Sequence, residues 1–123
     1  MYNVVVKGRF SSAHFLREYK GKCENMHGHN YLVEIMITSE KLNDEGMVID
    51  FSKLKETLKE VLLKLDHCLL NEIDFFKNIN PTSEDICFYI FSQVKEKLSN
   101  RYKLHKVRVW ETEEQYAEYY ELI

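Results

Sequence analysis

The period of the hydrophobic pattern changes twice along this sequence, and this limits the folds open to it. Residues 2–10 and 31–38 alternate with a period of two, which is typical of strands. Two helical stripes follow, and residues 104–111 and 117–123 return to strand-like patterns. The predicted order is therefore β-β-α-α-β-β. Strand pairs on either side of two helices favour an α+β fold, in which a four-stranded antiparallel sheet carries both helices on one face.

Each helical stripe begins at a capping signal. Apolar residues recur on one side of residues 51–65, and Asp50 can cap the start of this helix. Thr82 can cap the second helix, with Asp85 as a weak capping-box partner and Asn100 as the expected end.

Length and composition narrow the class of protein. The 123 residues suit one domain over residues 1–123, and eight Tyr and seven Phe exceed what one small core can bury, so subunit association is expected. A net charge of -3 without a long basic run argues against a nucleic-acid partner. No apolar stretch approaches the roughly 20 residues that span a bilayer. Three cysteines without a signal peptide indicate reduced thiols in a cytoplasmic protein.

Histidines are the strongest sign of chemistry. A polar stretch over residues 16–30, expected as a loop, contains His27-Gly28-His29. In extended backbone the two imidazoles point to the same side, and His14 at the end of the first strand can join them from a neighbouring strand. Three neutral imidazoles suit Zn²⁺ and leave a fourth position open for catalysis. The alternative is a strand-end histidine beside an ordinary polar turn.

Other reactive residues allow two readings each. Cys23 is a further zinc ligand, a catalytic base or an idle loop thiol. Asp66 and His67 either form an acid-base pair or merely end the first helix. Spacing alone favours the helix end. Glu111 ends an apolar strand face, either as a carboxylate in water or as a buried acceptor for a ligand.

Six segments carry a resemblance to a known family, in order and with compatible spacing. They are residues 10–14 (FSSAH), 23–30 (CENMHGHN), 46–51 (GMVIDF), 65–71 (LDHCLLN), 80–84 (NPTSE) and 111–112 (ET). Together they resemble the 6-pyruvoyltetrahydropterin synthase family and its bacterial relatives, the 6-carboxytetrahydropterin synthases. The match runs nearly from end to end.

The resemblance implies a tunnelling fold (T-fold), in which the sheets of neighbouring subunits join into a barrel with the helices outside. Such proteins are commonly hexamers of two stacked trimers, with active sites at subunit interfaces. It further implies that Zn²⁺ is the cofactor. The implied zinc ligands are His14, His27 and His29. The implied catalytic residues are Cys23 as base with Asp66 and His67 as its proton-relay partners. The implied pterin site is Glu111 with Thr82, Ser83 and Glu84 nearby.

The implied activity converts 7,8-dihydroneopterin triphosphate to 6-carboxytetrahydropterin, acetaldehyde and triphosphate, a step towards queuosine. Glu24 beside Cys23 also resembles a folate-linked branch, which uses a glutamate in this loop and leaves 6-hydroxymethyl-dihydropterin. The presence of Cys23 favours the carboxy product. Further alternatives are a 6-pyruvoyltetrahydropterin synthase, a non-catalytic pterin or zinc binder, and a zinc-hydroxide hydrolase.

Overall fold

A computed structural model describes residues 1–18 and 24–122. Its elements are β1 (Tyr2–His14), β2 (His27–Ser39), α1 (Phe51–Leu63), η1 (Leu70–Glu72), η2 (Asp74–Phe76), α2 (Ser83–Lys97), β3 (Lys103–Thr112) and β4 (Gln115–Tyr120). Leaving aside the two short 3₁₀ helices η1 and η2, which were not predicted, this order confirms the predicted β-β-α-α-β-β arrangement.

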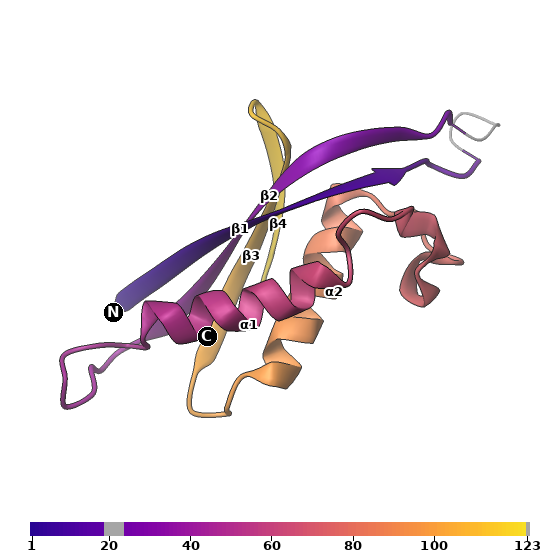
Figure 1. The fold of residues 1–123 in the computed structure, drawn as a ribbon. Helices are drawn as coiled ribbons and strands as arrows, with labels where there is room; N and C mark the ends of the chain where they lie inside the picture. Colours follow the sequence, from indigo (N-terminus) through magenta and orange to yellow (C-terminus); the bar gives the residue numbers. More distant parts are fainter. Residues whose placement is uncertain (19–23, 123) are drawn as a thin grey trace.

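The four strands form one antiparallel sheet in the order β1-β2-β3-β4. Helix α1 packs against β1, and α2 packs against β3 and β4, so both helices cover the same face (Figure 1). Strands β1 and β4 are the two edges of the sheet. The predicted α+β architecture is therefore confirmed.

The first two strands are longer than predicted, and the expected loop over residues 16–30 is correspondingly too long. Their ladder continues beyond Phe10–Tyr31 through Ser12–His29 to a final pair of His14 with His27. Polar side chains replace apolar ones at this end of the ladder, so the hydrophobic alternation stops before the hydrogen bonding does. The histidines therefore lie in regular strand.

The core lies between the sheet and the helices. Tyr31, Val33, Ile35 and Ile37 of β2 have no exposed surface and form its centre. Gly8 allows α1 to approach β1 closely, because a Cβ at this position would lie only 2.8 Å from a methyl carbon of Leu62.

The helix starts agree with the capping signals, but two details differ. Asp50 accepts the backbone N–H of Ser52, and Thr82 accepts that of Asp85. Phe51 was placed on the buried stripe but is 58% exposed, because the core-facing turns begin at Leu54.

The chain leaves α2 and β4 earlier than predicted. Helix α2 ends at Lys97 rather than at Asn100, since Leu98 already has an extended backbone. Strand β4 begins at Gln115 and ends at Tyr120, where the expectation was 117–123.

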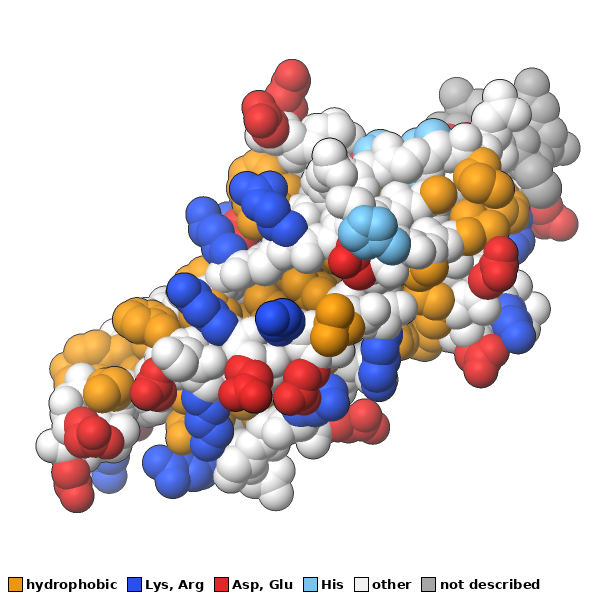
Figure 2. Space-filling model, viewed as in Figure 1, with side chains coloured by type: hydrophobic (Ala, Val, Ile, Leu, Met, Phe, Trp, Pro, Cys, Tyr) orange, Lys and Arg blue, Asp and Glu red, His pale blue; other side chains and the backbone are white. Residues whose placement is uncertain are grey.

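Hydrophobic side chains also reach the surface, where they show between charged ones (Figure 2). Tyr2, Tyr116 and Tyr120 on the edge strands are each about half exposed, at 46–50%. Among the described residues, no helix is long and apolar enough to cross a membrane.

Candidate functional site

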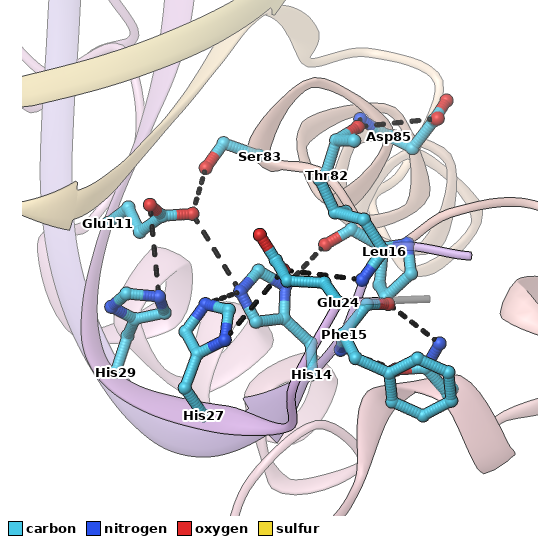
Figure 3. Close-up of polar contacts among 12 residues, drawn as sticks. His14, Phe15, Leu16, Glu24, His27, His29, Thr82, Ser83, Asp85 and Glu111 are labelled. Atoms are coloured by element: carbon cyan, nitrogen blue, oxygen red, sulfur yellow. Dashed lines mark hydrogen bonds and ion pairs between the residues drawn. The ribbon is translucent and has the colours of Figure 1, made fainter. Parts of the chain in front are cut away.

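Three histidines meet at the end of the β1–β2 ladder. His14 is the last residue of β1 and pairs with His27, the first residue of β2, while His29 lies two residues further along β2. The three imidazoles point toward one another (Figure 3), with ring centroids 4.6–5.1 Å apart. The strand period of two gives His27 and His29 the same side, as the sequence predicted.

Backbone carbonyls determine where the proton lies on two of these rings. Nδ1 of His14 lies 2.8 Å from the carbonyl oxygen of Pro81, and Nδ1 of His27 lies 2.9 Å from that of Asn25. Since a carbonyl only accepts, each Nδ1 donates its N–H and each Nε2 keeps a lone pair. The two Nε2 atoms are 3.1 Å apart. Two lone pairs this close repel each other, and a cation between them would turn the repulsion into binding.

His29 completes a donor set that fits a zinc ion. One ring nitrogen from each of His14, His27 and His29 lies within 4.8 Å of the other two. Nε2 of His29 is buried without a hydrogen-bond partner among the described residues. Tetrahedral Zn²⁺ with Zn–N distances of about 2.05 Å would separate its ligand nitrogens by about 3.3 Å. The cluster can therefore hold a metal with little rearrangement.

The electrostatics of the cluster favour the neutral rings that bind metals. Burial lowers the pKa of His29, although the nearby Glu111 carboxylate opposes this effect. Metal ligation needs unprotonated imidazole, so the environment of His29 suits it.

The carboxylate of Glu111 lies beside the histidines. Its two oxygens are 3.7 Å from Nε2 of His29 and 4.0 Å from Nε2 of His14, and the hydroxyl of Ser83 lies 3.4 Å away (Figure 3). Glu111 thus faces the cluster from β3, although its role as a pterin anchor stays a prediction.

A cavity of about 310 Å³ adjoins the imidazoles and is called the acidic cavity here. It is lined by His14 and His27, by Thr82, Ser83 and Glu84 at the start of α2, and by Glu24, Glu111 and Tyr116 among others. The predicted Thr82–Glu84 segment therefore shares a cavity with Glu111. Among the residues that the structure describes, the lining of this cavity has three carboxylates and no Lys or Arg.

Glu24 is directed into the acidic cavity rather than into bulk water. Its carboxylate accepts the backbone N–H of Leu16 at 3.3 Å and lies 3.7 Å from Nδ1 of His27. The glutamate can therefore reach a molecule bound at the histidines. Its neighbour Cys23, the predicted base, lies outside the described residues.

Asp66 and His67 form a close pair elsewhere on the molecule. His67 Nδ1 lies 2.9 Å from the Asp66 carboxylate, which also accepts the backbone N–H of Ser11 in β1. That backbone hydrogen bond is the largest cause of the lowered pKa of Asp66. His67 has a positive φ of 53°, a strained backbone conformation common at functional sites.

This pair does not line either cavity beside the imidazoles. The side chain of His67 is 82% exposed, and its backbone N–H donates to the carbonyl of Ser11 at the edge of β1. The pair is therefore an ordered acid-base unit. Among the described residues, it makes no contact with the histidine cluster of its own subunit.

The sequence did not single out the residues that anchor the chain after His14. Asn71 binds both the N–H and the carbonyl of Phe15, and Asn80 does the same for Arg17. Both asparagines occur in segments quoted above for the resemblance, but isolated asparagines in polar segments are indistinguishable from turn residues. They hold residues 15–17, which lead away from the histidine cluster.

A family model described as 6-pyruvoyl tetrahydropterin synthase matches residues 3–122. A curated relative from Archaeoglobus fulgidus, named putative 6-carboxy-5,6,7,8-tetrahydropterin synthase, is 47% identical over 110 residues, covering 89% of this chain and 87% of the relative. The structure of Caenorhabditis elegans 6-pyruvoyl tetrahydropterin synthase matches with a TM-score of 0.88 and 34% identity, covering 98% of this chain and 96% of that one.

A second solved structure is a Plasmodium vivax 6-pyruvoyltetrahydropterin synthase in which a glutamate described as a catalytic residue is replaced by alanine. It matches with a TM-score of 0.81 and 25% identity, covering 99% of this chain and 98% of that one.

Proposed function

Because the chain belongs to the 6-pyruvoyl tetrahydropterin synthase family, we propose that it is a zinc-dependent 6-carboxy-5,6,7,8-tetrahydropterin synthase. It converts 7,8-dihydroneopterin triphosphate and one water to 6-carboxytetrahydropterin, acetaldehyde and triphosphate. The A. fulgidus relative with the carboxy name supports this choice of product. The observation that carries the proposal is the opposed pair of Nε2 lone pairs of His14 and His27, 3.1 Å apart, with the orphaned Nε2 of His29 beside them.

The proposed zinc site uses His14, His27 and His29 as ligands. Zinc supplies a Lewis acid that lowers the pKa of the substrate's side-chain hydroxyls. The Nδ1 contacts of His14 and His27 hold their rings in the ligating tautomer. Their positions on paired strands restrict movement of the ligand nitrogens.

Glu111 is the proposed anchor of the pterin ring. A carboxylate accepts the N–H groups of a pterin through charge-assisted hydrogen bonds, and Ser83 is close enough to orient it. Thr82 and Glu84 line the same cavity. With the ring held by Glu111, the side chain of the substrate would point at the imidazoles 3.7–4.0 Å from that carboxylate.

Proton transfer is assigned to Cys23 with Asp66 and His67. A cysteine close to a metal has a lowered pKa and can act as a base. A reducing cytoplasm would keep this thiol out of disulfide bonds. The Asp66 carboxylate, 2.9 Å from Nδ1 of His67, fixes the orientation of its ring. Since His67 is mostly exposed and apart from its own histidine cluster, we propose that it serves the site of a neighbouring subunit.

Association of subunits follows from the same proposal. Residues 11–13 of β1 bond the segment 66–68, but among the described residues the rest of β1 and β4 leave unpaired edges. The half-exposed tyrosines on these strands gain burial if edges of neighbouring subunits pair. Three subunits would form one barrel from their sheets, and two barrels would stack as a hexamer. This assembly would bring the Asp66–His67 pair of one subunit to another subunit's histidines.

The product of the proposed reaction would enter queuosine synthesis.

A second product is favoured by the position of Glu24. Its carboxylate faces the acidic cavity, and the P. vivax relative has a catalytic glutamate. Glu24 could take the proton of the C2′ hydroxyl, so that the C1′–C2′ bond breaks, the outer two carbons leave as an aldehyde that carries the triphosphate, and C1′ takes up a proton to give 6-hydroxymethyl-dihydropterin. This chain would then combine the two activities of the family.

The test is to incubate zinc-loaded protein with 7,8-dihydroneopterin triphosphate and to identify the products by mass. We expect 6-carboxytetrahydropterin from the wild type and a loss of about 10²–10⁴-fold in its rate of formation from Cys23→Ala. The matched variant Glu24→Ala should lose only 6-hydroxymethyl-dihydropterin. A wild type that binds zinc but forms neither product contradicts the proposal.

A further inference from the structure

Two asparagine side chains bind residues 15–17 in the way that a neighbouring strand would. The amide of Asn71 accepts the backbone N–H of Phe15 at 3.0 Å and donates to its carbonyl oxygen, also at 3.0 Å. The amide of Asn80 makes the same two contacts with Arg17, at 2.7 and 3.2 Å. Each amide offers one donor and one acceptor to one residue, as a paired strand does. Residues 15–17 therefore continue the hydrogen bonding of β1 beyond its last pair.

The side chain of Arg17 strengthens this attachment. Its two terminal guanidinium nitrogens donate to the carbonyl oxygens of Asn71 and Ile79, each at 3.1 Å. Both asparagines are thus bound to Arg17, Asn71 through its backbone and Asn80 through its side chain. The position of residues 15–17 is therefore determined by the segment that contains the two asparagines.

Leu16, between the two anchored residues, binds Glu24. In extended backbone, successive residues direct their N–H and C=O groups to opposite sides, so Leu16 faces away from the asparagines. Its N–H donates to the Glu24 carboxylate at 3.3 Å, and its carbonyl oxygen accepts the backbone N–H of Glu24 at 2.9 Å (Figure 3). Glu24 is therefore held by Leu16 at both its side chain and its backbone.

These contacts connect the asparagines to the acidic cavity without making them part of it. Leu16 and Glu24 both line that cavity, whereas Asn71 and Asn80 do not. His14 has separate support, because its Nδ1 donates to the carbonyl oxygen of Pro81 and its backbone belongs to the β1–β2 ladder. A change at the asparagines should therefore reach Glu24 and leave the histidines in place.

We propose that Asn71 and Asn80 are positioning residues, which fix Glu24 at the acidic cavity by way of residues 15–17. The consequence for catalysis rests on the proposed function, in which Glu24 and its neighbour in sequence, Cys23, move protons. A proton acceptor works only within hydrogen-bond reach of its substrate atom, so a small displacement lowers the rate of the chemical step. Metal binding and pterin binding do not depend on this displacement.

Hydrogen exchange at the backbone amide of Glu24, followed by NMR, tests the chain of contacts without any turnover. Asn80→Ala removes both hydrogen bonds to Arg17, and Asn80 is only partly buried outside the helices and strands, so the fold should be retained. The Glu24 N–H bonds Leu16 and not Asn80, so its exchange responds only if residues 15–17 transmit the loss. We expect exchange about tenfold faster, because two hydrogen bonds are removed.

Two comparisons show whether the effect is specific. Asn78→Ala is the matched control, because Asn78 is exposed and, among the described residues, takes no part in the hydrogen bonds of residues 15–17. It should leave the exchange rate at Glu24 unchanged. The amide of Val33 in the core strand β2 should keep its rate in every variant. A Glu24 amide that is unprotected in the wild type, equal exchange in the wild type and Asn80→Ala, or equal acceleration at Glu24 and Val33 overturns the inference.

Turnover of 7,8-dihydroneopterin triphosphate tests the catalytic consequence. Asn80→Ala should lower kcat about tenfold at unchanged KM and zinc content. Asn80→Asp keeps an acceptor for the N–H of Arg17 and should restore part of this rate. A raised KM or a loss of zinc at unchanged kcat overturns the positioning role. A wild type that forms no pterin product overturns the proposed function instead, and the exchange rate at Glu24 still decides whether the asparagines position it.

Discussion

Replacement of His29 by glutamine should remove most of the thermal stabilisation that zinc gives this protein. The structure shows why the wild type should bind tightly. Nε2 of His14 and Nε2 of His27 are already 3.1 Å apart, against about 3.3 Å expected between ligands of tetrahedral zinc. Formation of the zinc site should therefore cost little conformational free energy. His29 supplies the third nitrogen.

The size of the effect follows from mass action. Zinc at 100 times its dissociation constant stabilises the native state by about 2.7 kcal/mol. An unfolding entropy of about 2.1 cal/mol/K per residue gives about 0.26 kcal/mol/K for 123 residues, so the melting temperature should rise by about 10 °C. Loss of a ligand should weaken zinc binding at least about 100-fold, the upper end of what losing an outer-sphere partner costs. At the same zinc concentration, His29→Gln should gain only about 0.4 kcal/mol, or about 1.5 °C.

The assay is a thermal melt of metal-free protein with and without zinc, combined with metal analysis of the same samples. His105→Gln is the matched control, because His105 lies on β3 outside the histidine cluster and Nδ1 of its ring donates to the carbonyl oxygen of Glu121. It should keep the full shift of about 10 °C. A comparable zinc shift in His29→Gln, with one tightly bound zinc per subunit, would refute the three-histidine site.

Two further predictions test other parts of the structure. Glu111→Gln should raise the KM for the pterin substrate by about 10-fold or more at unchanged zinc content, because the carboxylate's charge-assisted hydrogen bonds are worth about 1.5–3 kcal/mol each; an unaltered KM would remove it as the ring anchor. Burial raises the pKa of the Cys87 thiol from 9.0 to about 12, so above pH 9 the unfolded chain loses a proton that the native state keeps. Stability should therefore fall between pH 9 and 10, by up to about 1.4 kcal/mol, and thermal melts of Cys87→Ala should show a shallower loss; equal slopes would contradict the reasoning.

Strand and helix periodicity predicted the fold well because burial and hydrogen bonding agree over most of the sheet. They disagree at one end, where β1 and β2 continue through Ser12 and His29 to His14 and His27. There the ladder persists while apolar side chains give way to polar ones, so a hydrophobic pattern cannot mark the strand ends. Predictions of the element limits failed at the functional end for this physical reason.

In the candidate site, the sequence predicted what depends on local spacing and not what depends on long-range contacts. The spacing of His27 and His29 is local, so the sequence predicted their shared side. The contact of Glu111 with His29 and the acidic character of the neighbouring cavity depend on β3 and α2, which are more than 50 residues away in sequence. The separation of Asp66 and His67 from the cluster likewise depended on how the chain returns to the edge of β1.

Register links the three histidines to the core. Phe10 and Tyr31 are paired across β1 and β2, stack with ring centroids 4.6 Å apart, and are almost fully buried. Four residues further along β1, and four back along β2, the same ladder pairs His14 with His27. A slip of one residue would turn Tyr31 out of the core and His29 away from His14 at the same time. The burial that stabilises the sheet therefore also places the three imidazoles beside one another, while the Nδ1 contacts of His14 and His27 orient their rings.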